Sequence, residues 1–114
     1  MDDYRKVVLK TSRRIHPDDR LTRIAFGLTK NAGDFAGFID SMEFKHQKMD
    51  RENMLKTLGD VLWYVELATL MLGVTREEVE QINIDKLKLQ VPEDFAIVAK
   101  AEEKEQDETP ESED

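Results

Sequence analysis

Apolar residues recur at intervals of three and four along four stretches of the chain, and this spacing predicts amphipathic helices. The first helix begins after Asp2 or Asp3 and ends before Pro17, because a residue that precedes proline avoids the helical conformation. The second helix is expected over residues 20–43. No stretch shows the strict alternation of a strand, so the pattern predicts an all-α fold.

The third helix carries signals at both of its ends. Asp50 is expected to cap its first turn, and Met49 and Met54 have the spacing of a hydrophobic staple. Gly73 is placed to end the helix in the left-handed conformation. Apolar residues between these ends cover more than one face, so this helix is expected to be central or shared between subunits.

The fourth helix has the clearest start in the chain. Thr75 and Glu78 have the spacing of a capping box, and Val74 and Val79 form a second staple. The helix is expected to continue to about Leu89 and to stop before the next proline. Short connections favour antiparallel neighbours, so the four segments together predict a four-helix bundle.

The net charge of −8 is concentrated at the C-terminal end of the chain. Residues 101–114 contain eight acidic residues and one lysine, so the preceding part is nearly neutral. With no aliphatic residue larger than alanine, they are expected to form a disordered acidic tail after a domain of residues 1–100. The tail is either a solubilising extension or a negative arm that meets a basic partner. Because neither half offers a basic patch, direct nucleic acid binding is not expected.

Length and cysteine content restrict the class of protein further. A chain of 114 residues makes a small core that a partner chain often completes, so a homodimer or homotetramer is expected. The chain contains no cysteine, and a reducing cytoplasm is the simplest compartment for it. No apolar run approaches the ~20 residues that cross a bilayer, and no signal peptide is recognised, so membrane association is not expected.

Two pairs of polar residues stand beside the apolar stripes of the second and third helices. Residues three apart share a helix face, so Asn31 lies beside Asp34, and Thr57 lies beside Asp60. If the two helices pack side by side, the pairs face one pocket. A carboxylate beside a core needs a hydrogen-bonding partner, a cation or water. Spacing alone leaves open whether that cation is a metal or a lysine, for which the candidates are Lys30, Lys56 and Lys86.

Three stretches of the chain together resemble one known family. They are "IAFGLTKNAGDFAGFID", "DRENMLKTLGDVLWYVELATLMLGVTREEVEQINIDKLK" and "VPEDF". They resemble the MazG-like nucleotide pyrophosphohydrolases of the all-α NTP pyrophosphatase superfamily, over roughly residues 4–95, and look most like the short stand-alone members found in phages and bacteria. The resemblance implies a homodimer or higher assembly that uses Mg²⁺ to hydrolyse nucleoside triphosphates to monophosphates and pyrophosphate.

The resemblance also implies a metal site, which this chain retains only in part. The family takes a Glu-x-x-Glu pair from one helix and a Glu-x-x-Asp pair from the next. By position, the first pair falls on Asn31 and Asp34 and the second on Thr57 and Asp60. Only Asp60 keeps the family residue. Asp34 keeps the charge on a shorter arm, whereas the other two positions lose it.

Two hypotheses follow from this partial site, and no catalytic residue is assigned in either. In the first, the chain is a pseudoenzyme that keeps the fold to bind a nucleotide or a protein partner, for instance as a phage product that blocks a host factor. Asn83 and Lys86, on the segment that resembles the family's substrate-side helix, would then contact nucleotide phosphates, unless Lys86 is an ordinary surface lysine. In the second, the chain is an active Mg²⁺-dependent nucleotide pyrophosphohydrolase with a reduced metal site held by Asp34 and Asp60.

Overall fold

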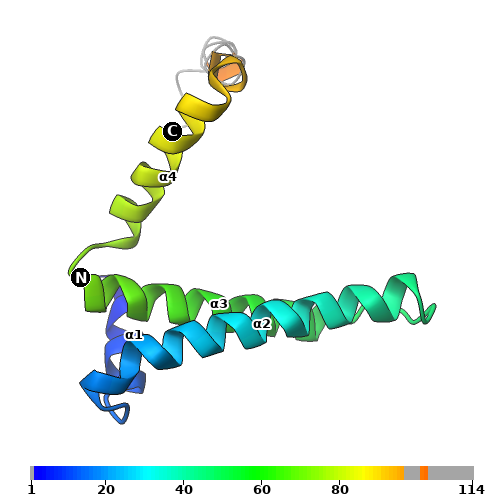
Figure 1. Ribbon diagram of the computed structural model, residues 1–114, viewed down its shortest axis with the longest axis horizontal. Coiled ribbons are helices and arrows are strands. Elements are labelled where there is room, and N and C mark those ends of the chain that lie inside the picture. Colours follow the sequence, from blue (N-terminus) through cyan, green and yellow to red (C-terminus); the bar gives the residue numbers. More distant parts are fainter. Residues whose placement is uncertain (1, 97–100, 103–114) are drawn as a thin grey trace, which may run out of the picture. The chain divides into compact units, whose positions relative to one another are not determined.

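The chain is predominantly helical in the part that the computed structural model describes, residues 2–96 and 101–102 (Figure 1). No strand occurs in these ranges, and the all-α prediction is confirmed. The elements are α1 (Asp3–Ser12), the 3₁₀ turn η1 (Pro17–Asp19), α2 (Arg20–Glu43), α3 (Arg51–Leu72) and α4 (Arg76–Gln90). Residues 92–96 add a further helical turn.

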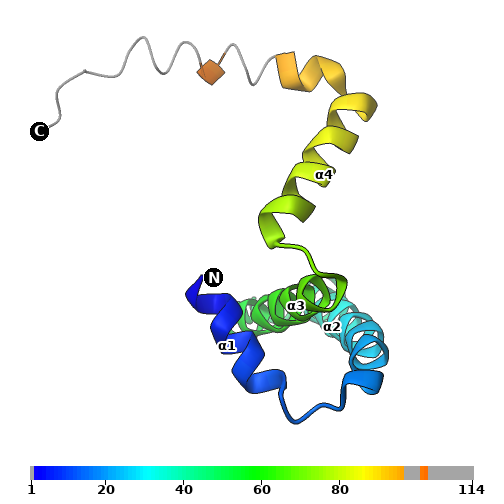
Figure 2. The same cartoon turned by 90° about the vertical axis from the view of Figure 1, so that its left-hand side faces the viewer.

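The chain divides into two compact units, Met1–Arg76 and Glu77–Asp114. In the first unit, α2 and α3 run antiparallel along each other (Figure 1) and α1 packs on α3 (Figure 2). The turn η1 packs on α2. The antiparallel arrangement that short loops favour is therefore found for the α2–α3 pair. Three helices build this unit, and the predicted bundle of four remains a prediction.

Both predicted caps of α3 are confirmed. The carboxylate of Asp50 accepts a hydrogen bond from the backbone N–H of Asn53 at 3.3 Å. Gly73 has a φ of 71°, in the left-handed region, and its N–H donates to the carbonyl of Leu70. These are local signals, so the sequence alone suffices to locate them.

Asp2 has two roles at the start of α1. Its side chain accepts a hydrogen bond from the backbone N–H of Arg5 at 2.8 Å, which places it at the N-cap. This bond, more than the nearby Arg76 guanidinium, holds the pKa of Asp2 below its usual value, with burial acting in the opposite direction. Asp2 also lies 3.2 Å from Arg76, so it links the first helix to the end of the unit.

The core of the first unit is small. Among the described residues, three hydrophobic side chains are buried: Val8 of α1, Ile24 of α2 and Leu67 of α3. Several large apolar side chains of α3 stay exposed instead, and Leu55 and Leu58 each keep 49% of their surface in contact with water. Such a core stabilises a chain of this size only weakly on its own.

The second unit is described by α4 and the helical turn after it. Every residue of α4 from Glu77 to Gln90 is exposed. The ammonium group of Lys88 lies 5.9 Å from the centroid of the Phe95 ring. The predicted acidic tail lies outside the described residues apart from residues 101–102, which are helical and exposed. No single helix of the described ranges is long and apolar enough to cross a membrane.

Candidate functional site

A pocket of about 250 Å³ opens between α2 and α3. It is lined by Lys30, Asn31, Asp60, Trp63 and Tyr64. The first two residues come from α2 and the other three from α3, so the helix pair as a whole builds the pocket. One member of each predicted polar pair lines it, whereas Asp34 and Thr57 do not.

Gly27 allows the two helices to approach beside this pocket. A Cβ atom at residue 27 would overlap the ring of Tyr64, which packs directly against the backbone there. Gly27 and Asn31 are one helical turn apart on α2, as Asp60 and Tyr64 are on α3. The close approach of Gly27 and Tyr64 therefore brings Asn31 and Asp60, one turn further along each helix, to the same pocket.

Asp34 is paired with a lysine of its own helix. The Lys30 Nζ lies 2.8 Å from Asp34 Oδ2, in an i,i+4 pair that is largely exposed. Hydrogen bonding to Asp34 is the main reason that the pKa of Lys30 is raised, and the charges of Asp34 and Asp60 act in the same direction. Lys30, one of the candidate lysines, is therefore a partner of Asp34.

Asp60 keeps its carboxylate free within the described part of the chain, where it forms no hydrogen bond or ion pair. Lys56, a candidate partner, lies 3.1 Å from Glu52 instead. The pKa of Tyr4 is raised above its usual value, chiefly by burial, and the Arg76 guanidinium opposes this rise. The negative charge of Asp60 makes a smaller contribution in the same direction as burial. Asp60 is thus the accessible carboxylate of the pocket.

Asn31 is buried, with 4% of its surface exposed, and its amide nitrogen has no hydrogen-bond partner in the described structure. A buried donor without a partner costs about 1–3 kcal/mol, and a ligand that offers an acceptor recovers this loss. Thr57 is also buried, on α3. Both uncharged members of the predicted pairs therefore lie in the interior of the helix pair, where a glutamate would be costly to accommodate without a cation.

Two aromatic rings form one wall of the pocket. The indole N–H of Trp63 donates to the hydroxyl of Thr11 at 2.8 Å, which fixes its orientation from α1. The rings of Trp63 and Tyr64 meet edge to face, with centroids 5.2 Å apart. Helical spacing in the sequence does not single out this wall, because adjacent aromatic residues are common in cores and interfaces.

The predicted phosphate contacts lie elsewhere in the chain. Asn83 and Lys86 are on α4, in the second unit, and both are exposed. No group of three or more acidic or histidine side chains arranged to hold a metal occurs among residues 2–96 and 101–102. The metal and nucleotide assignments thus remain predictions.

Glu66 is the buried acid that the sequence pattern does not reveal. Only 1% of its surface is exposed, and its Oε1 accepts a hydrogen bond from Arg5 Nη1 at 2.9 Å. Arg76 Nε lies 2.7 Å from Oε2, an ion pair whose N–H direction does not satisfy hydrogen-bond geometry. The hydroxyl of Thr69 is 3.1 Å from Oε1. The guanidinium of Arg76 also lies 5.3 Å from the Tyr4 ring centroid. Two cations thus surround one buried carboxylate.

A signal for Glu66 exists in the sequence, although it is weak. The residue stands within the apolar run "WYVELATLML", where a charge needs a partner, but its partner Arg5 is 61 positions away in the sequence.

No protein-family model, curated protein or solved structure matches this chain. The family resemblance therefore depends on the motifs themselves.

Proposed function

We propose that this chain is a MazG-like nucleotide pyrophosphohydrolase-fold protein with an impaired hydrolytic site, acting by binding a nucleotide or a protein partner. The observation that carries the proposal is the 2.8 Å ion pair between Lys30 and Asp34. Two of the four positions that carry acids in the family keep a carboxylate in this chain, Asp34 and Asp60. The ammonium group of Lys30 pairs with the first of them. Asn31 and Thr57, the other two positions, are uncharged.

The donors present do not fit the carboxylate-rich magnesium site that the resemblance implies. Two unit charges 4 Å apart interact by about 4 kcal/mol at an effective dielectric constant of 20, so each lost carboxylate weakens cation binding substantially. Lys30 adds a positive charge at the same place and repels a second cation. Amide and hydroxyl oxygens can still coordinate Mg²⁺, but they do not offset its charge.

The same pocket has features that suit a nucleotide without a metal. The wall formed by Trp63 and Tyr64 offers aromatic surface for a base. The partnerless amide nitrogen of Asn31 can donate to a base carbonyl, and Lys30 can approach a phosphate. Asn83 and Lys86 are exposed on α4 of the second unit and are proposed as separate phosphate contacts.

The second candidate is an active pyrophosphohydrolase with a reduced site. Asp60 favours it, because this carboxylate lines the pocket and is unpaired within the described ranges. In that case Mg²⁺ would be held by Asp60, with substrate phosphates and water as further ligands. No role in proton transfer is assigned to any residue of this chain.

A turnover assay separates the two candidates. We expect the wild-type chain to release little pyrophosphate from any nucleoside or deoxynucleoside triphosphate with Mg²⁺ or Mn²⁺. The combined change Lys30→Ala, Asn31→Glu and Thr57→Glu restores the negative charge, and at about 4 kcal/mol for each charge pair we expect a gain of at least about 100-fold. Pyrophosphate release is the measurement.

The control is Lys56→Ala, which removes a lysine of α3 that pairs with Glu52 outside the pocket. This change is expected to leave turnover unaltered. Circular dichroism of the restored variant shows whether its two buried substitutions preserve the helices. Rapid hydrolysis by the wild type that is lost in Asp60→Asn would refute the impaired-site proposal and establish the active enzyme.

We also propose that the chain associates with a second copy of itself through α3. Leu55, Leu58 and Leu62 recur at intervals of three and four on this helix, and between 42% and 49% of each is exposed. The small core of the first unit leaves this apolar stripe uncovered, and two copies of the stripe can pack against each other around a two-fold axis.

A charge placed in this stripe tests the association. Leu58→Glu is expected to convert the assembly to monomer, because burying an unpaired carboxylate at an apolar interface is unfavourable by several kcal/mol. Molar mass from light scattering after size-exclusion chromatography is the measurement. Lys56→Glu, on the same helix but outside the stripe, is the matched control. A wild-type chain that is monomeric at all concentrations would contradict this proposal.

A further inference from the structure

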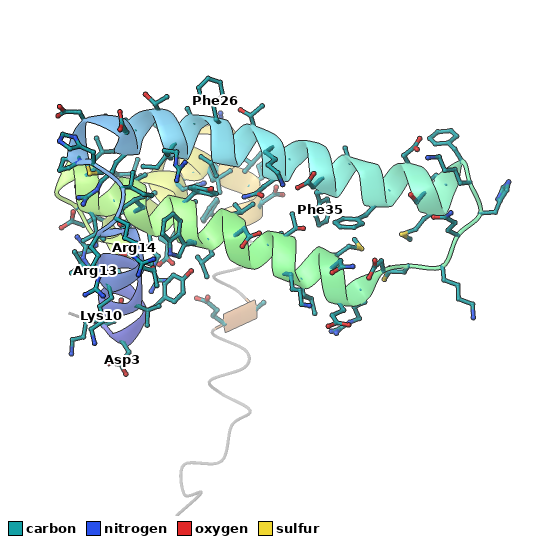
Figure 3. All side chains as sticks on the ribbon, turned by 90° about the horizontal axis from the view of Figure 1, so that it is seen from below. Asp3, Lys10, Arg13, Arg14, Phe26 and Phe35 are labelled. Carbon is teal, nitrogen blue, oxygen red and sulfur yellow. The ribbon has the colours of Figure 1, made fainter. Side chains whose placement is uncertain are left out.

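Basic side chains gather where α1 ends and α2 begins. Lys10 lies on α1, Arg13 and Arg14 follow its last turn, and Arg23 lies in the first turn of α2. Figure 3 shows Lys10, Arg13 and Arg14 together at this end of α1. All four belong to the first unit, so one compact body positions them. We call these four residues the basic corner.

Two hollows adjoin the basic corner. The larger, about 420 Å³, is lined by Arg14, Ile15, His16, Asp19, Thr22 and Arg23. The smaller, about 310 Å³, is lined by Lys10, Thr11, Arg13 and Arg14. Arg14 lines both, so the two hollows are neighbours that share one guanidinium group.

The cations of the basic corner form no ion pair within the described part of the chain. Arg5, Arg20 and Arg76 each bind an oxygen of the protein. By contrast, no ion pair or side-chain hydrogen bond joins any of the four basic-corner residues to another described residue. Like charges held close together repel one another, and a bound anion removes this repulsion.

The neighbouring polar groups are compatible with an anion. His16 Nδ1 accepts a hydrogen bond from the backbone N–H of Asp18 at 3.1 Å, so a neutral ring carries its proton on Nε2 and can donate from there. The hydroxyl of Thr22 is a second donor at the larger hollow. Asp19 lines this hollow as well and contributes the opposing charge.

We propose that the basic corner binds a small anion that carries two linked phosphate groups. A guanidinium group forms paired hydrogen bonds to phosphate oxygens, and two hollows that share Arg14 can accept two adjacent phosphates. The site is distinct from the pocket between α2 and α3, because the two sets of lining residues have no member in common.

A compact anion fits this surface better than a nucleic acid does. The four cations of this corner lie within residues 10–23 and line two small hollows. A long polyanion extends beyond such a patch, and most of its phosphates would find no cation there. A diphosphate remains within the two hollows.

Calorimetric titration of the full chain with pyrophosphate, in the absence of metal, tests the proposal. Arg14→Gln is expected to weaken binding about tenfold or more, because hydrogen bonds to charged groups contribute about 1.5–3 kcal/mol each. Arg23→Gln should weaken it to a smaller extent, since that residue lines only one hollow. Inorganic phosphate should bind more weakly than pyrophosphate, and added salt should weaken both.

Two matched controls assign the binding to this corner. Arg51→Gln removes an exposed arginine of α3 and is expected to leave pyrophosphate affinity unchanged. Lys30→Gln removes the lysine of the α2–α3 pocket and shows whether pyrophosphate binds there instead, so a failure of this proposal can be told apart from a failure of the function proposed for that pocket. The proposal is overturned if pyrophosphate does not bind, if binding survives Arg14→Gln, or if binding is lost only in Lys30→Gln. Tighter binding of a single-stranded oligonucleotide, abolished by Arg14→Gln, would overturn it in favour of nucleic acid.

Discussion

Replacing Glu66 with alanine is expected to lower the free energy of unfolding by about 3 kcal/mol, since removal of one partner leaves buried charges without compensation. Glu66 is 1% exposed and is bound by Arg5 at 2.9 Å and by Arg76 at 2.7 Å. The expected loss lies at the lower end of the range for buried ion pairs, because both guanidinium groups retain some contact with water. Urea unfolding followed by circular dichroism measures it.

An exposed ion pair provides the comparison. Asp40 lies 3.6 Å from Lys45, and both side chains are more than half exposed. Asp40→Ala should therefore change the free energy of unfolding by less than about 1 kcal/mol, as exposed pairs usually do. If Glu66→Ala proved as mild as this control, the cluster around Glu66 would have no special part in stability.

Alanine at position 27 is expected to destabilise the protein by about 1–2 kcal/mol. Alanine is the better helix former by up to about 1 kcal/mol, but its Cβ would overlap the ring of Tyr64, and overpacking costs about 1–3 kcal/mol. The ring must move, and it lines the pocket between α2 and α3. We therefore expect Gly27→Ala to weaken nucleotide binding at that pocket as well as stability.

Gly33 offers a matched control on the same helix. A Cβ at position 33 meets nothing within 4 Å, so Gly33→Ala should stabilise the protein by about 0.5–1 kcal/mol through helix propensity alone. The double variant Gly27→Ala, Tyr64→Ala removes the overlap and should lose less than the sum of its single changes. Equal effects of the two glycine substitutions in urea unfolding would contradict close packing at Gly27.

Local features of this fold could be predicted from the sequence. The caps at Asp50 and Gly73 involve residues within one helical turn, so their pattern is complete in a short stretch of chain. The bounds of α2 follow for a similar reason, since a proline turn precedes it and a polar connection follows. Placing Asn31 and Asp60 at one pocket required only that α2 and α3 pack side by side, which their short connection favours.

Interactions between distant residues could not be predicted in this way. The sequence pattern singles out Asp60 as an acid in an apolar helix. In the structure Asp60 is exposed, and Glu66 is the acid of this helix that is buried. Glu66 is buried beside Arg5, which pairs with it from 61 positions away in the sequence, and helical periodicity does not predict a contact between such distant residues. The basic corner was not predicted, because its four cations are spread over residues 10–23 and come together only where the chain passes from α1 to α2.

The ion cluster at Glu66 also bears on the order in which the first unit assembles. The α2–α3 pair is joined by a short connection, so its contacts close a small loop and form at little entropic cost. The bond from Arg5 to Glu66 closes a much longer one and forms only when α1 docks. We therefore expect α1 to join a preformed helical hairpin, with the Arg5 guanidinium group as the final latch. Loss of that latch would mainly accelerate unfolding and leave the rate of folding nearly unchanged.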